Sequence, residues 1–403
     1  MPRINPAILT WARETAGLSP EDAARKIGIN DTLKFKAVER LHALEIGDIE
    51  PSRPLLLKMA KQYRRPLISF YLSAVPARGE RGDDFRTLPE GRDQSSEALV
   101  DALVRDIRAR QEMVRASLLD EDAQVLSFVA SRSMGDGVMS VVNDIKQKIL
   151  FDRLNFRGQR NPEDGFASLR SAVEDAGIFV MLIGNLGSHH TALECEVFRG
   201  FALADPIAPF IVINDQDAKA AWSFTLLHEL AHLWLGQTGI SGANAASDVE
   251  KFCNDVASYI LLPQEEVAAM VLPTQLNLDS LIKLVSDFAR PRNLSYSLVA
   301  YRLLAAERIS HDLWQEAHAR FRMLWQRERL RARAAAREND SGGPSYYIVR
   351  RHKLGKALLS FVRQQLDAGD LTPSKAAKIL GVKARSVFPL VKDDDLLRFR
   401  STH

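Results

Sequence analysis

The chain has 403 residues, of which 46% are hydrophobic and 26% charged, so its composition is that of an ordinary globular protein. No stretch approaches the roughly 18 uninterrupted apolar residues of a membrane helix, and the first residues lack the apolar core of a signal peptide. The sequence therefore predicts a cytoplasmic protein without membrane association. Its two cysteines, Cys195 and Cys253, fit a reducing compartment and exclude a disulfide framework.

The net charge of +3 is unevenly distributed along the chain. Residues 1–75 contain 12 basic and 8 acidic side chains (+4), residues 76–319 contain 23 and 35 (−12), and residues 320–403 contain 19 and 8 (+11). A basic start, an acidic middle and a strongly basic end indicate modules with different partners. The length itself allows two or three domains.

The first 75 residues have the pattern of a compact helical unit with helix-turn-helix organisation. Ser19 precedes Pro20 as the N-cap of the second helix, which Gly28 ends, and Gly47 ends the third.

A helix-turn-helix unit places its third helix in the major groove of DNA, with basic side chains holding phosphates. Four residues in or just before this helix are the predicted DNA contacts: Lys34, Lys36, Arg40 and His42. Glu39 and Glu45 share the helix, and the net charge is modest for a DNA-binding domain. Docking onto a DNA-bound partner protein is therefore the alternative to base-specific DNA binding.

The middle of the chain alternates helical and strand patterns. A segment rich in Pro, Gly, Asp and Ser at 73–96 reads as a linker. Short apolar runs at 177–184 and 209–214 are expected to be strands, and the segment 195–205 between them is expected to pair with both. Helical periodicity predicts helices over 97–131, 136–150, 162–176, 218–235, 245–262, 278–288 and 295–307.

The basic end of the chain is also expected to be helical. Residues 318–339 form an Arg-rich helix, residues 340–345 a joint, and the remainder a small helical unit in which Thr372 caps a helix that Gly381 ends. This basic C-terminal tail is a candidate for non-specific contact with nucleic acid. The alternative is a charged helix that simply faces solvent.

The strongest chemical signal is the sequence HELAH at 228–232. Residues four apart project from one face of a helix, so His228 and His232 can share a metal ion, while Glu229 lies beside it. There Glu229 can take a proton from a water molecule that the ion has made more acidic, which is the logic of the HExxH metallopeptidases. The flanking residues are almost all apolar, and burying three ionisable groups among them is costly unless they bind Zn²⁺.

A catalytic zinc site needs a third protein ligand. The next predicted helix offers Glu250, eighteen residues after His232, and Asn254 one turn later as a group that orients a ligand. The competing interpretation of Glu250 is a solvated carboxylate at the start of a helix.

These residues resemble the ImmA/IrrE family of bacterial metallopeptidases, which are gluzincin-like because the third ligand is a glutamate on a following helix. The resemblance lies in the strand followed by HELAH and in "VEKFCNDVASYILLP", where Cys253 stands in place of the usual alanine. The N-terminal stretch and "DDFRTLP" resemble the XRE-type helix-turn-helix domain that precedes the peptidase in many long members.

The resemblance implies a zinc-dependent endopeptidase in which His228, His232 and Glu250 bind Zn²⁺ and Glu229 is the general base. The expected partner is a protein substrate, a transcriptional repressor whose cleavage induces stress-response or mobile-element genes. We expect an extended substrate to pair with the strand at 210–214, taken as the edge of its sheet. Two alternatives are a DNA-binding regulator that keeps the peptidase fold as a sensor or scaffold, and an antitoxin-like partner.

The predicted fold class is α+β and predominantly helical. The predicted domains are a helix-turn-helix domain at 1–75, a linker and helical connector at 76–130, a zincin-like metallopeptidase domain with a small β-sheet at 131–318, and a basic helical extension at 319–403.

Overall fold

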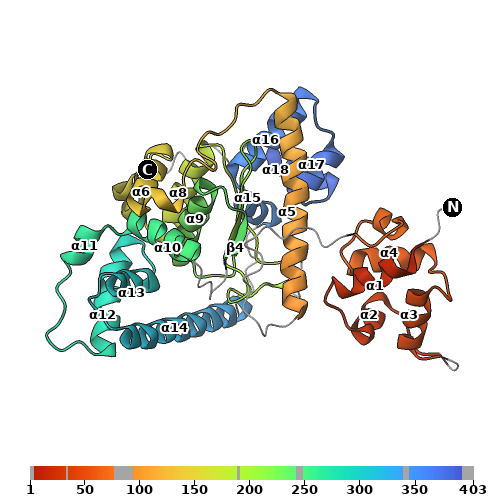
Figure 1. The fold of residues 1–403 in the computed structure, drawn as a ribbon, viewed down its shortest axis with the longest axis horizontal. Helices are drawn as coiled ribbons and strands as arrows, with labels where there is room; N and C mark the ends of the chain where they lie inside the picture. Colours follow the sequence, from red (N-terminus) through yellow and green to blue (C-terminus); the bar gives the residue numbers. More distant parts are fainter. Residues whose placement is uncertain are drawn as a thin grey trace. The chain divides into compact units, whose positions relative to one another are not determined.

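The computed structural model describes residues 4–32, 35–76, 94–187, 191–241, 248–338 and 345–392 (Figure 1). In these ranges the chain is predominantly helical and contains a four-stranded sheet, which confirms the predicted α+β class. The chain divides into two compact units, one made of residues 1–109 and 185–193, the other of residues 110–184 and 194–403. Within the described ranges, every helix is too short or too polar to serve as a bilayer span.

In the first unit, short helices enclose an apolar core. They are α1 (Pro6–Glu14), α2 (Pro20–Ile27), α3 (Ala37–Ile46), α4 (Arg53–Gln62) and the 3-10 helix η1 (Leu67–Tyr71). Ser19 caps α2 by accepting a hydrogen bond from the backbone N–H of Asp22 at 3.1 Å, and Gly28 ends it with φ of 77°. Both features were predicted from the sequence.

A buried ion pair holds α1 against α3. The guanidinium of Arg13 donates two hydrogen bonds to the carboxylate of Glu45, at 2.7 and 3.1 Å, and both side chains are largely buried. Glu45 therefore serves the packing of this unit, which explains an acidic residue on the third helix.

The second unit is built on a sheet with strand order β1-β3-β2-β4. The strands are β1 (Phe179–Leu182), β2 (Gly200–Leu203), β3 (Phe210–Ile213) and β4 (Gly239–Ser241). β1 and β3 are parallel, whereas β2 is antiparallel to both β3 and β4. Every residue of β1, β2 and β3 is buried, which explains why these strands read as continuous apolar runs rather than alternating patterns.

Two sequence predictions about this sheet were wrong. The strand at 210–214 is not an edge strand, because Phe210 pairs with Phe179 of β1 on one side and with Leu203 of β2 on the other. The segment 195–205 contributes β2, which pairs with β3 and β4 but not with β1. A continuous apolar run indicates that both faces of a strand are covered, and carries no information about its place in the sheet. β4 lies in a stretch that the sequence indicated to be only a loop.

Helices of the second unit cover both faces of the sheet. The remaining helices of the chain are α5 (Gln94–Asp120), η3 (Met134–Asp136), α6 (Val138–Lys148), α7 (Arg153–Gly158), α8 (Pro162–Asp175), α9 (Lys219–Trp234), α10 (Asp248–Leu261), α11 (Gln264–Ala268), α12 (Leu278–Ala289), η5 (Arg290–Arg292), α13 (Tyr296–Ala305), α14 (His311–Glu338), α15 (Tyr346–Leu354), α16 (Lys356–Ala368), α17 (Pro373–Leu380), η6 (Ala384–Ser386) and α18 (Val387–Val391). Of these, α8, α9, α15 and α16 are in contact with the strands of the sheet. Val180 and Ile211 share a core with Leu230 of α9, whereas Phe179 meets Phe361 of α16 at 6.0 Å between ring centroids. Figure 1 accordingly shows α8, α9 and α10 on one side of the sheet and α15, α16 and α18 on the other.

The helix predicted over 97–131 ends earlier, at Asp120 of α5. Residues 121–131 form local turns, and two of their backbone N–H groups donate to distant segments: Leu126 to the Pro206 carbonyl at 2.7 Å and Ala130 to the Leu233 carbonyl at 3.0 Å. The apolar residues of this segment are spaced as in a helix, but the segment is irregular and packs against the rest of the second unit.

The C-terminal helices α15 to α18 are packed into the second unit. Arg170 of α8 donates a hydrogen bond to the His352 carbonyl at 2.5 Å, and Glu174 accepts one from the Lys356 N–H at 3.1 Å. The two side chains form an ion pair at 3.3 Å and are both buried. As predicted, Thr372 caps α17, which Gly381 ends.

Candidate metal centre

The helix α9 presents the HELAH residues inside the protein. From Thr225 to Trp234 every residue is buried, because α9 is enclosed by β2, β3, α8 and α10. A helix that is apolar on all sides is expected in such a position. His228, Glu229 and His232 are 4%, 0% and 1% exposed, so their polar groups need partners within the protein or a bound ion.

Glu250 brings the third candidate ligand from α10. This helix packs directly on α9, and its buried stripe includes Cys253, Val256 and Ile260. Glu250 lies in the first turn of α10, on the same buried side of the helix, and faces the two histidines. Its side chain is 8% exposed. The solvated-carboxylate interpretation of Glu250 is thus not supported.

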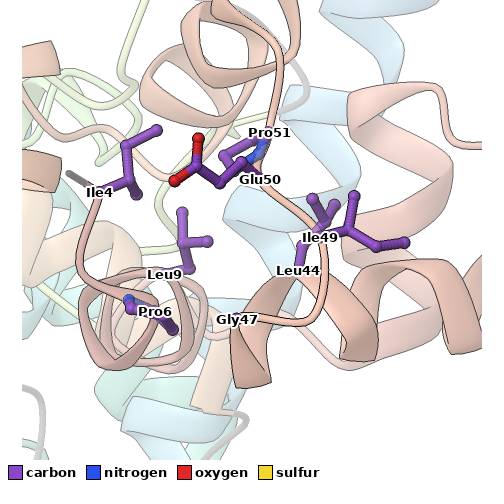
Figure 2. Close-up of a pocket in the computed structure, with 8 residues that line it drawn as sticks. All are labelled: Ile4, Pro6, Leu9, Leu44, Gly47, Ile49, Glu50 and Pro51. Carbon is purple, nitrogen blue, oxygen red and sulfur yellow. The ribbon is translucent and has the colours of Figure 1, made fainter. Parts of the chain in front are cut away.

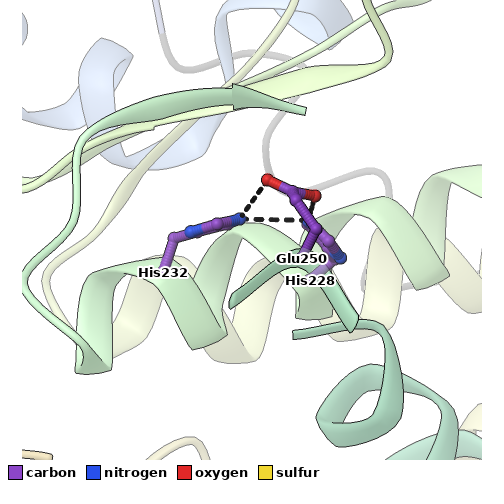
Figure 3. A group of neighbouring side chains, drawn as sticks. All are labelled: His228, His232 and Glu250. Carbon is purple, nitrogen blue, oxygen red and sulfur yellow. Dashed lines mark hydrogen bonds and ion pairs between the residues drawn. The ribbon is translucent and has the colours of Figure 1, made fainter. Parts of the chain in front are cut away.

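The three side chains converge on one point (Figure 3). The Nε2 atoms of His228 and His232 are 3.1 Å apart, and the two carboxylate oxygens of Glu250 lie 3.1 Å from His228 Nε2 and 3.3 Å from His232 Nε2. Tetrahedral Zn²⁺ with ligand bonds of about 2.1 Å sets its ligand atoms roughly 3.4 Å apart. Two imidazole nitrogens and a carboxylate at these separations therefore fit a zinc ion in both chemistry and spacing.

The charges of the three groups are strongly coupled. Burial by itself would raise the pKa of Glu250, but hydrogen bonds with His228 and His232 lower it to about 2. Burial lowers the pKa of His228, whereas for His232 hydrogen bonds with Cys253 and Glu250 outweigh burial and raise the pKa well above its ordinary value. The carboxylate of Glu250 thus faces two imidazole rings, and a divalent cation bound by the three groups would compensate its charge.

Glu229 lies beside the ligands and against the backbone of β2. A Cβ atom built on Gly200 would lie 2.7 Å from Oε1 of Glu229 and 2.7 Å from Cγ2 of Thr225. The charge of Glu229 also acts on His232, whose pKa it helps to raise. The fully buried carboxylate is therefore held between the first residue of β2 and the metal ligands. The role of Gly200 could not be predicted from the sequence, because this contact joins residues that are far apart in the chain.

Asn254 and Cys253 flank the ligands from α10. Asn254 is near enough to His228 to hydrogen-bond to it, and this contact counteracts the lowering of the His228 pKa by burial. Cys253 is fully buried and contacts His232. The expectation that Asn254 orients a ligand is consistent with its position.

The predicted DNA contacts lie on the first unit. Lys34 is outside the described residues, while Lys36, Arg40 and His42 are exposed at the start and along α3. A small pocket in this unit, drawn in Figure 2, is lined by Ile4, Pro6, Leu9, Leu44, Gly47, Ile49, Glu50 and Pro51. Its lining is apolar apart from Glu50 and contains none of the predicted DNA contacts, so DNA binding stays a prediction.

Comparison with known families identifies the part of the chain that carries the site. Residues 173–304 match the family model described as the IrrE N-terminal-like domain of peptidase M78. The match includes β1 to β4, α9 and α10, and with them His228, Glu229, His232 and Glu250. The ImmA/IrrE resemblance is confirmed for this segment, about a third of the chain, which is similar to a domain of that peptidase family. No curated protein and no solved structure matches the chain.

Proposed function

We propose that the chain is a zinc-dependent endopeptidase that cleaves a regulatory protein, such as a transcriptional repressor. The observation that carries this proposal is the convergence of His228, His232 and Glu250 within hydrogen-bonding distance of one another, with Glu229 buried beside them. In the alternative, a regulator that keeps the fold as a sensor or scaffold, the metal ligands would contribute only to stability. Such a protein would not need the adjacent carboxylate of Glu229.

Each residue of the site has a separate role in this proposal. His228, His232 and Glu250 would hold Zn²⁺, which supplies Lewis acidity towards the peptide carbonyl and acidifies the attacking water. Glu229 takes the proton from that water and delivers it to the nitrogen of the departing amine. Because Glu229 rests against Gly200, its carboxylate has little freedom to turn away from the reacting atoms.

An extended peptide is proposed to pair with β4, in place of the strand at 210–214. β4 is the last strand in the sheet order, and its Ser241 pairs with Gly200, the residue that contacts Glu229. Main-chain pairing at the side of β4 that faces no other described strand would align a substrate next to the metal centre without demanding a particular side chain.

The regulatory substrate is suggested by the chain's resemblance to long ImmA/IrrE members. The first unit, with its exposed α3, is proposed to bring the peptidase to DNA or to a DNA-bound protein.

The test compares wild type with Glu229→Gln in the native host. Glutamine keeps the size of the side chain but cannot accept the proton. Wild type or Glu229→Gln is expressed in the host, and the N-termini of all host proteins are then profiled by mass spectrometry. Wild type and the variant are also purified, and their zinc content is measured. We expect a new N-terminus inside a regulatory protein only with wild type, and about one zinc ion in each protein. Identical N-terminal profiles, with zinc bound in both proteins, would show that the chain is not an endopeptidase.

A further inference from the structure

One face of α14 carries alternating aromatic and cationic side chains. Spacings of three or four residues place six of them within about 80° around the helix axis. These residues, here called the α14 row, are His311, Trp314, His318, Arg322, Trp325 and Arg329. The rings of Trp314 and His318 stack with centroids 5.6 Å apart, and the guanidinium of Arg329 lies 5.2 Å from the centre of the Trp325 ring. Four of the six are only half-exposed, so most of the row lies against the protein.

The α14 row leads towards the metal centre. Arg329 donates a hydrogen bond of 3.0 Å to the side chain of Gln216, in the loop that joins β3 to α9. His318 is close enough to Arg199 to be affected by its charge. Arg199 directly precedes Gly200, the residue against which Glu229 rests. Figure 1 shows α14 running along the second unit towards the sheet.

The positive charges of this surface are poorly compensated. The nearest carboxylate oxygen to Arg199, on Asp217, is 3.8 Å away, at the outer limit of an ion pair. Arg329 is bonded to a neutral amide, and in the described part of the chain Arg322 takes part in no ion pair. Burial, then Arg322 and Arg199, lower the pKa of His318, and no carboxylate contributes. The surface thus joins Arg199, from the acidic middle of the chain, with Arg322 and Arg329, from its basic end, and is electropositive.

We propose that the α14 row and Arg199 bind an acidic segment of the protein substrate and thereby select which peptides reach the metal centre. Planar guanidinium groups bind carboxylates through paired hydrogen bonds, and the two tryptophans offer apolar faces for the neighbouring side chains. The inference rests on the proposed endopeptidase function. Aromatic rings between arginines also suit single-stranded nucleic acid. The link from the row through Arg199 to Gly200, which contacts Glu229, favours a peptide.

The chain offers a matched control for this surface. Arg320 and Arg327 lie on the same helix about 180° away from the row, and both are exposed. Arg322→Glu/Arg329→Glu therefore has the same charge change as Arg320→Glu/Arg327→Glu, on opposite faces of α14. Melting temperature and zinc content show whether a variant folds correctly. If charge reversal impairs folding, Arg322→Gln/Arg329→Gln is the milder variant.

The first experiment measures binding without cleavage, in full-length protein that carries Glu229→Gln. The probes are a fluorescent peptide containing four Asp and Glu residues, the same peptide with Asn and Gln in their place, and an oligothymidine strand. We expect the acidic peptide to bind best and the row variant to weaken it about tenfold, with little effect of the control variant. Equal weakening by the two variants, or tightest binding of the oligothymidine, would overturn the proposal.

The second experiment measures which peptides of an unstructured peptide library are cleaved by zinc-loaded wild type. We expect acidic residues to be enriched at a fixed distance from the cleaved bond, and this enrichment to be lost in the row variant but not in the control. Cleavage without any acidic preference would overturn the specificity proposal alone. If nothing is cleaved but acidic peptides bind through the row, the endopeptidase function is wrong and acidic recognition remains supported.

Discussion

Gly200 and Glu229 are in contact across the interface between β2 and α9: a Cβ atom at position 200 would lie only 2.7 Å from Oε1 of the glutamate. Two features of the fold meet there, because Gly200 pairs with Ile213 and Ser241 within the sheet while Glu229 follows the first metal ligand. The backbone of β2 at Gly200 therefore packs against the side chain of Glu229, the proposed general base, and restricts its movement.

Gly200→Ala is expected to lower the rate of peptide cleavage by about 100-fold, because the added methyl group must displace the Glu229 carboxylate from its position. Zinc content should stay unchanged. Single-turnover cleavage of the substrate identified by N-terminal profiling measures the effect. Gly158→Ala is the control, since a Cβ atom there meets no atom within 4 Å. Full activity of Gly200→Ala would mean that Glu229 need not be held in place.

Glu250→Gln is expected to lower zinc affinity by at least about 100-fold, because a neutral amide replaces the anionic ligand. Competition with a fluorescent zinc chelator measures this. The exposed Glu265 supplies the control variant, Glu265→Gln, which should bind zinc as wild type does. Equal affinity of both variants would remove Glu250 from the ligand set.

Glu174→Ala is expected to destabilise the second unit by about 3–5 kcal/mol, because the guanidinium of Arg170 would remain buried without its carboxylate. Urea denaturation followed by tryptophan fluorescence measures the change. Arg363 and Asp367 form an exposed pair at 3.5 Å on α16, and Asp367→Ala should cost no more than about 0.5 kcal/mol. Similar effects of the two substitutions would show that the C-terminal helices are not anchored through Arg170 and Glu174.

Both cysteines are expected to resist thiol reagents in the folded protein. Cys195 is 5% exposed and Cys253 is fully buried, and burial raises the pKa of the Cys195 thiol, so its reactive thiolate stays scarce even at pH 8. Titration with Ellman's reagent should detect no thiol within minutes in native protein and two after unfolding. Rapid reaction of one thiol under native conditions would contradict the packing around that residue.

The convergence of His228, His232 and Glu250 could be expected from the sequence, because much of their relationship is local. His228 and His232 are one helical turn apart, and the apolar flanks of α9 correctly indicated burial. Glu250 followed from the need for a third ligand and from the amphipathic stripe of α10. Caps such as Ser19 and Thr372 were equally readable, because a cap depends on residues three positions apart.

Relationships between distant segments were predicted less well. The interior position of β3 depends on where β1 and β2 lie, and its own apolar residues are compatible with several places in a sheet. The contact of Gly200 with Glu229 and the convergence of Arg199 with the α14 row join elements that the sequence separates. The early end of α5 at Asp120 arises because the following residues bond to other segments.

The anchoring of the C-terminal helices has a consequence for synthesis of the protein. Glu250 is the last of the three candidate metal ligands to be translated, whereas the backbone groups of His352 and Lys356 that complete the Arg170 and Glu174 contacts follow about 100 residues later. Domains fold as units while the chain leaves the ribosome from its N-terminus. All four residues of the candidate site are therefore synthesised before the contacts that close the second unit can form, and stable packing around that site is expected only near the end of translation.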